Sequence, residues 1–313
     1  MTAPRPFRFG VKLRHTDDGP SWAAQARRIE SLGYATLTVP DHFGTQFAPL
    51  VAATAAACAT SRLRIATSVL GNDFRHPALL AKEAATLDVL SGGRLELGLG
   101  AGWARSDYES TGIAFDPPGV RVERLAEAIC LLRACFAGGR ATFEGRHYRV
   151  RDLDASPRPV QRPGPPILIG GGGRRILTLA AREADIVGIN PVARSGRQDP
   201  DMDRDATDAA TDRKVGWIRA AAGARLETLE LCMQSLCISI TGDRAVADRA
   251  LTRRFPDLPI DEARRVPSAW TGSIDAVCDR LESHRERWGI SYWIVPLDAV
   301  EILAPIIDRL SGR

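Results

Sequence analysis

The 313-residue chain has few lysines, no C-x-x-C pair and no long hydrophobic run. Arginine supplies nearly all of its positive charge, and these arginines lack the interleaved aromatic residues of a nucleic-acid-binding surface. The Ala-rich run Phe47–Thr60 is shorter than the roughly 20 residues that span a bilayer. No apolar signal segment follows Met1. We therefore expect a cytoplasmic protein that binds neither nucleic acid nor a membrane.

Motifs for metal binding and for nucleophilic catalysis are also missing. The five histidines are scattered, with no H-E-x-x-H motif, and there is no G-x-S-x-G elbow. The six cysteines lie within apolar segments, which predicts buried free thiols without a metal or disulfide role. No metal site is expected.

Short β-rich runs alternate with longer amphipathic segments along the chain. Strands are expected at Arg8–Leu13, Thr36–Val39, Leu63–Leu70, Leu95–Gly100, Ile167–Gly170, Ile186–Ile189, Leu231–Ile240 and Tyr292–Val295. Helices are expected at Trp22–Leu32, Pro77–Leu90, Val122–Phe136, Arg174–Glu183, Ala206–Ala222, Arg244–Arg253, Ser273–Trp288 and Asp298–Leu310. This count predicts an α/β fold, a single-domain (β/α)8 TIM barrel over residues 1–313. A doubly wound sheet would need a G-x-G-x-x-G after the first strand, and that motif is absent.

Two polar stretches are longer than ordinary barrel loops. Ala141–Pro166 is rich in proline and arginine, and Pro191–Asp205 has few apolar residues. We interpret both as insertions, near 141–166 and 191–205, and the second as a candidate lid over the C-terminal face.

Residues at the C-terminal ends of barrel strands are the first candidates for chemistry. The second strand is followed by Asp41 and His42. Histidine changes charge near neutral pH, so His42 is a candidate for proton transfer, with Asp41 to tune or orient it. The alternative is a structural histidine beside a helix-capping aspartate.

Glycine-rich segments follow three other strands. Gly71 follows the third strand, and Gly98-Leu99-Gly100-Ala101-Gly102-Trp103 ends the fourth; both allow a flat ligand to approach the backbone, although close packing also explains the glycines. The fifth strand runs through Gly170, Gly171, Gly172 and Gly173 into Arg174 and a helix. Free backbone N–H groups, the helix dipole and Arg174 together predict an anion-binding cradle, such as a cofactor phosphate requires.

These motifs, in this order, resemble the bacterial luciferase-like oxidoreductase superfamily, and within it the branch that uses the deazaflavin coenzyme F420. The resemblance extends from Phe9-Gly10-Val11-Lys12 through Asp41-His42-Phe43 to the last strand. It implies a barrel with insertions and a non-prolyl cis peptide between Ser68 and Val69 beneath the cofactor ring. It also implies that Asp41 and the backbone of Ala101 and Gly102 contact the deazaflavin.

By the same resemblance, Gly170, Gly171, Gly172, Gly173 and Arg174 contact the cofactor phosphate, and His42 is the acid/base. The family's sugar-phosphate dehydrogenases have a catalytic glutamate where this chain has Trp103. Trp103 would instead line an apolar pocket, with Asp107 or Tyr108 as alternative polar groups. The candidate substrate pocket comprises Lys12, His15, Gln46, Trp103, Asp107 and Asn190.

The sequence thus suggests an F420-dependent oxidoreductase that exchanges a hydride with a small organic substrate while His42 moves the proton. A two-component FMN-dependent monooxygenase of the same superfamily is one alternative, and a non-catalytic flavin-binding barrel is another. We expect a homodimer, and a separate enzyme that reduces the cofactor.

Overall fold

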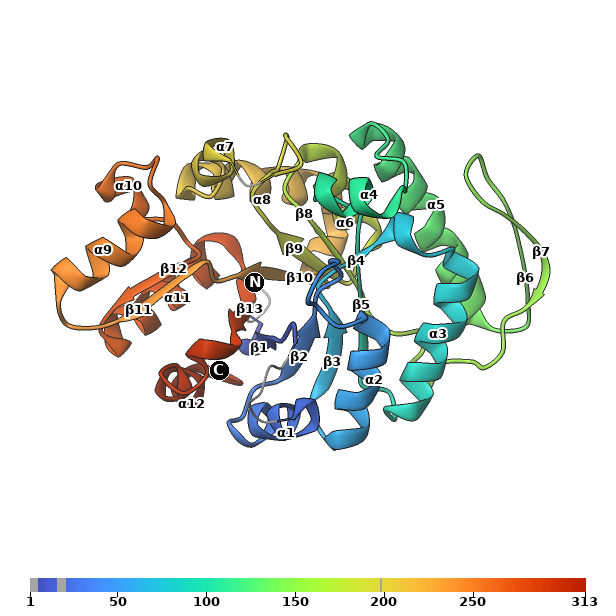
Figure 1. The fold of residues 1–313 in the computed structure, drawn as a ribbon, viewed down its shortest axis with the longest axis horizontal. Coiled ribbons are helices and arrows are strands. Elements are labelled where there is room, and N and C mark those ends of the chain that lie inside the picture. The colour runs from blue at the N-terminus through green and yellow to red at the C-terminus, as the bar shows by residue number, and fades with distance from the viewer. Residues whose placement is uncertain (1–4, 16–20, 198) are drawn as a thin grey trace.

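A closed parallel barrel forms the centre of the computed structural model, which describes residues 5–15, 21–197 and 199–313. In these residues, eight parallel strands close into a ring through the pairing of β3 with β5, which confirms the predicted barrel (Figure 1). Around the ring, they are β1 (Arg8–Lys12), β2 (Thr36–Val39), β3 (Arg64–Thr67), β5 (Leu95–Gly100), β8 (Ile167–Gly171), β9 (Ile186–Ile189), β10 (Glu230–Gln234) and β13 (Ile290–Pro296). Their near-continuous burial suits strands covered by helices.

A buried ion cluster fills the interior of the barrel near the start of its strands. Glu96 of β5 is buried and accepts hydrogen bonds from Arg8 at 2.7 Å and Arg64 at 2.5 Å. Burial opposes ionisation of this carboxyl, but the two guanidinium groups hold the pKa of Glu96 below its ordinary value. Because charge and side chains close this end, the open end lies at the carboxyl termini of the strands.

Helices surround the barrel, most of them close to their expected bounds. They are α1 (Trp22–Ser31), α2 (Pro49–Ala59), α3 (Pro77–Leu90), α5 (Pro118–Ala137), α6 (Arg174–Glu183), α8 (Asp208–Ala222), α11 (Ile274–Trp288) and α12 (Ala304–Leu310). The side chains of Ser21 and Ser273 cap α1 and α11, and Gly289 ends α11 in the left-handed region at φ 84°. The sequence analysis missed α2, which follows β2 within the run Phe47–Thr60.

The expected strand Leu231–Ile240 is wrong as a single element. Its first half is β10 of the barrel, whereas β11 (Cys237–Ile240) leaves the ring and pairs with β12 (Ala269–Gly272). Helices α9 (Arg244–Arg254) and α10 (Ile260–Ala263) pack beside this small sheet around a separate core containing Phe255 and Leu258, in the orange part of Figure 1. Residues 237–272 therefore form an insertion outside the barrel that the sequence analysis did not predict.

The two expected insertions have some regular structure. Residues 141–166 overlap an antiparallel hairpin of β6 (Arg140–Glu144) and β7 (Arg149–Asp154). Residues 191–205 include α7 (Pro200–Arg204), capped by the side chain of Asp199; Gln198 lies outside the described residues. All six cysteines are free, but Cys58 and Cys130 are exposed, which corrects the expectation that all are buried.

Among the described residues, none of the helices is long and apolar enough to cross a membrane. The same residues contain no group of three or more His, Cys, Asp or Glu side chains that could hold a metal ion.

Candidate functional site

A cavity of about 920 Å³ opens at the carboxyl ends of the barrel strands. Such a volume accommodates a cofactor ring together with a small ligand. Of the residues named from the sequence, those that line it are Lys12, Asp41, His42, Ser68, Val69, Gly71, Gly100, Ala101, Gly102, Trp103, Asp107, Tyr108, Gly170, Gly171, Gly172, Gly173, Arg174 and Asn190. His15 and Gln46 are not among the described residues that line it.

Val69, Gly71 and Gly100 line one side of the cavity, which we call its floor. The peptide bond between Ser68 and Val69 is cis, as the sequence resemblance implied, and it separates β3 from β4 (Leu70–Gly71). A Cβ atom on Gly100 would lie 2.7 Å from a methyl carbon of Val69, and one on Gly98 would lie 1.8 Å from the carbonyl oxygen of Thr67. Close packing against Thr67 and Val69 therefore accounts for Gly98 and Gly100.

Asp41 does not orient His42, contrary to the expectation from their adjacency. Its carboxylate accepts a hydrogen bond from the backbone N–H of Gly71 at 3.0 Å and forms a bidentate ion pair with Arg75. Asp41 is buried, so this pair is shielded from solvent. The carboxylate thus fixes the backbone that follows the cis bond, and Arg75 is a site residue that the sequence analysis missed.

Asp107 is the group that orients His42. It lies on α4 (Arg105–Thr111), and its Oδ2 is 2.7 Å from Nδ1 of the imidazole. Among the described residues, Nε2 of His42 has no hydrogen-bond partner, and the side chain is 30% exposed. A carboxylate on one ring nitrogen and a free second nitrogen at a cavity is an arrangement suited to proton transfer.

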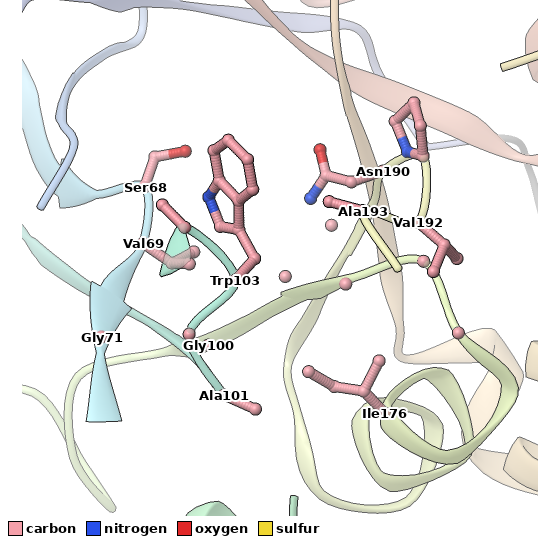
Figure 2. Close-up of a pocket in the computed structure, with 18 of the residues that line it drawn as sticks. Ser68, Val69, Gly71, Gly100, Ala101, Trp103, Ile176, Asn190, Val192 and Ala193 are labelled. Carbon is pink, nitrogen blue, oxygen red and sulfur yellow. The ribbon is translucent and has the colours of Figure 1, made fainter. Parts of the chain in front are cut away.

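Trp103 stands beside this pair at the mouth of the cavity. Its ring meets the His42 ring edge-on, with the ring centroids 5.6 Å apart. In Figure 2 the indole lies between Ser68 on one side and Asn190 on the other. Because a large apolar ring is 39% exposed here, Trp103 shapes the space left for a ligand.

Arg121 holds the turn that carries Trp103 and Asp107. Its guanidinium donates hydrogen bonds to the carbonyl oxygens of Ala101, at 3.0 Å, and Gly102. It lies 4.2 Å from the centroid of the Phe115 ring. Gly102 has φ 75°, a conformation that favours glycine. The buried Arg121 was not found from the sequence, because its partners are backbone atoms 19 and 20 residues away.

Tyr108, the other polar group named from the sequence, also lines the cavity. Its hydroxyl donates to Asp73 at 3.0 Å, and burial, followed by the Asp73 charge, raises the pKa of Tyr108. The phenol therefore stays protonated and engaged with Asp73 at neutral pH. Asp107 is the polar group of α4 that reaches the cavity histidine.

In the four-glycine segment at the end of β8, Gly171 and Gly172 are closely packed, whereas Gly173 is next to open space. A Cβ on Gly171 would lie 2.4 Å from Ile176, and one on Gly172 would lie 2.3 Å from the carbonyl oxygen of Asn190, so both glycines are required by packing. Gly173 has no atom within 4 Å of such a Cβ, although it lines the cavity and caps α6 without a side-chain hydrogen bond. The first turn of α6 therefore faces open space, as a bound anion would require.

The segment after β9 forms the wall opposite Trp103. Asp205 accepts a hydrogen bond from the backbone N–H of Val192 at 2.9 Å and pairs with Lys214 at 2.7 Å. Lys214 also donates to the carbonyl oxygen of Asn190 at 2.9 Å. These contacts fix the position of the start of the candidate lid.

The wall formed by β1 carries the cationic side chain of Lys12. Lys12 donates a hydrogen bond to Oε1 of Gln234, and the amide nitrogen of Gln234 donates to the Ser68 hydroxyl at 3.3 Å. Burial, and next to it the positive charge of Arg14, lowers the pKa of Lys12 to about 8. Gln234 links three barrel strands at the cavity and was missed in the sequence.

Comparisons with known proteins agree with the fold. A family model described as luciferase-like monooxygenase matches residues 6–289. The chain is 30% identical over 307 residues to a protein of Nakamurella multipartita named F420-dependent glucose-6-phosphate dehydrogenase, covering 93% of this chain and 85% of that one. It is 33% identical over 201 residues to an uncharacterized protein of Mycobacterium tuberculosis, covering 56% of this chain and 70% of that one.

Among solved structures, the coenzyme F420-dependent tetrahydromethanopterin reductase of Methanopyrus kandleri superposes with a TM-score of 0.77. The two sequences are 19% identical, and the alignment covers 98% of this chain and 100% of that one. At this identity, the superposition establishes a shared fold.

Proposed function

Because the chain belongs to the luciferase-like monooxygenase family, we propose that it is an oxidoreductase that uses coenzyme F420 to exchange a hydride with a small organic substrate. The observation that carries the proposal is that three features line one and the same cavity. One wall has the glycine cradle of α6, the floor has the cis Ser68–Val69 bond, and the mouth has the His42–Asp107 pair. Relatives named for F420-dependent reactions support the choice of cofactor.

The cavity fits a ring cofactor that carries an anionic side chain. Gly173 leaves open space at the start of α6, and the exposed Arg174 and Arg175 line the cavity beside it. These groups would hold a phosphate. Val69 and the backbone of Gly71 would support the flat ring from below, with Asp41 and Arg75 fixing that backbone. When bound, a deazaflavin supplies two-electron hydride chemistry, and the protein supplies orientation.

His42 is the proton donor or acceptor in this proposal. Asp107 accepts from Nδ1–H, so the proton that reacts is carried on Nε2 of this cavity-lining histidine. Trp103 then restricts the substrate to the space beside this nitrogen and limits the access of water.

An FMN-dependent monooxygenase shares the fold, and oxygen consumption distinguishes the two reactions. The purified protein is mixed aerobically with reduced FMN, and separately with reduced F420, and oxygen is followed with an electrode. We expect the protein to leave both background rates unchanged, because hydride transfer uses no oxygen. Oxygen uptake that rises in proportion to protein only with reduced FMN would establish the monooxygenase instead. Protein that retains F420 but turns over no hydride acceptor in a broad screen would identify a non-catalytic binding barrel.

A further inference from the structure

The cavity has two cationic walls on opposite sides of the barrel. Arg174 and Arg175 follow β8, whereas Lys12 ends β1 and Arg14 follows it, and all four line the cavity. In the ring order, β1 and β8 are separated by three strands in either direction, so the two groups face each other across the barrel axis. One anionic cofactor phosphate at α6 would therefore lie on the side of the barrel opposite the β1 wall.

The carboxylates of the cavity do not supply that counter-charge. Among the described residues, three lining carboxylates are present, and each is paired with another partner: Asp41 with Arg75, Asp107 with His42, and Asp205 with Lys214. Neither Lys12 nor Arg14 forms an ion pair with any carboxylate that the structure describes. Within the described residues, no carboxylate thus compensates the positive charge of the β1 wall.

A hydrogen bond to a neighbouring barrel residue fixes the position of the Lys12 side chain. Its ammonium group is bound to the neutral amide oxygen of Gln234, which leaves further N–H donors for a ligand. Burial and the neighbouring charge of Arg14 both disfavour the ammonium form. Lys12 is partly buried, and a cation in such surroundings is unfavourable unless an anion or another acceptor pairs with it.

We propose that Lys12 and Arg14 form the substrate's anion-binding subsite, so that the enzyme acts on a small organic anion, a carboxylate or a phosphate ester, rather than on a neutral molecule. The inference rests on the proposed function in one respect, the assignment of the α6 cradle to the cofactor. Gln234 positions the Lys12 ammonium, and the Arg14 guanidinium closes on the anion from the mouth of the cavity. The anionic group at β1 thereby directs the rest of the substrate toward the floor at Ser68, to which Gln234 is also hydrogen-bonded.

The test compares ligand pairs that share a carbonyl and differ in the anion. Pyruvate is compared with acetone, and dihydroxyacetone phosphate with dihydroxyacetone, by isothermal titration of the protein with and without saturating oxidised F420. We expect the anionic member of at least one pair to bind at least tenfold more tightly, because a charge-assisted contact is lost in the neutral one. A preference for pyruvate over acetone would indicate a carboxylate substrate. A preference for dihydroxyacetone phosphate over dihydroxyacetone would indicate a phosphate ester.

Substitutions show which residues cause the preference for the anionic ligand. Lys12→Met and Arg14→Gln are each expected to weaken binding of the anion roughly tenfold and to leave F420 affinity unchanged. The matched controls Lys82→Met and Arg27→Gln remove exposed cations on α3 and α1 and should change neither. Arg14 is exposed, so its variant keeps the test available if Lys12→Met does not fold.

Equal binding of charged and neutral ligands would overturn the proposal. So would an anion preference that survives Lys12→Met and Arg14→Gln but disappears in Arg174→Gln, because the anion would then occupy the α6 cradle. Loss of F420 binding with a retained, Arg14-dependent anion preference would instead refute the proposed function and leave this subsite intact.

Discussion

Replacing Gly173 by aspartate should stabilise the fold while it weakens cofactor binding. Gly173 is the N-cap of α6 with φ −81° and ψ 155°, and a Cβ there meets no atom within 4 Å. Aspartate is a favoured N-cap that also complements the helix dipole. We therefore expect the cap and the dipole interaction together to raise the free energy of unfolding by about 0.5–1 kcal/mol.

The same carboxylate would compete with an anionic cofactor for the N–H groups of the first turn of α6. Repulsion between two unit charges about 5 Å apart costs roughly 1.7–3.3 kcal/mol at an effective dielectric of about 20–40. Because about 1.4 kcal/mol is tenfold in affinity, the dissociation constant should rise roughly 20- to 200-fold.

The assay is a fluorescence titration with oxidised F420, paired with urea unfolding of each variant. Gly173→Asn caps the helix without the charge and should lose much less affinity. Gly242→Asp adds a carboxylate at an uncrowded position that does not line the cavity, and should lose none. A folded Gly173→Asp protein with wild-type affinity would refute the assignment of the α6 cradle to the phosphate.

Three further outcomes are expected. His42→Gln should lower turnover at least 100-fold, Asp107→Asn about 10- to 100-fold, and the double variant no more than His42→Gln alone; additive losses would show that Asp107 does not act through His42. Burial, with Arg280 and Arg287 nearby, lowers the pKa of His284 from 6.5 to about 3. Stability that His284 supports is therefore lost as pH falls below 6.5, and His284→Phe should reduce the acid destabilisation at pH 4 by up to about 3 kcal/mol in urea unfolding; an unchanged pH profile would contradict this. Exposed apolar side chains on the neighbouring helices α2 and α3, including Val51 and Leu90, support a homodimer, which light scattering should find at twice 33.9 kDa; a monomer at micromolar concentration would refute it.

The barrel strands were predictable because each is a short apolar run between helical segments. The α2 helix was not, because its sequence, rich in alanine with Leu50 and Val51, is apolar on every face and lacks an amphipathic period. The strand Leu231–Ile240 was predicted too long, since its apolar pattern continues through Ser235-Leu236, where the chain leaves the ring.

Within the site, residues at strand ends were predictable, but their partners were not. Asp41 and His42 are adjacent, and consecutive side chains of an extended segment point to different sides. The carboxylate that meets His42 is Asp107, 65 residues away. Arg75 pairs with the Asp41 carboxylate, Arg121 binds backbone carbonyl oxygens, and Gln234 binds Lys12 and the Ser68 hydroxyl. The closed barrel brings these partners together from distant parts of the chain, and no local motif marks such contacts.

Direct binding of the two candidate cofactors tests the central claim. The purified protein is titrated with oxidised F420 and, in parallel, with FMN, under identical conditions. The account predicts saturable binding of F420 with a dissociation constant on the order of micromolar and at least tenfold weaker binding of FMN. Micromolar binding of FMN with none of F420 would contradict it.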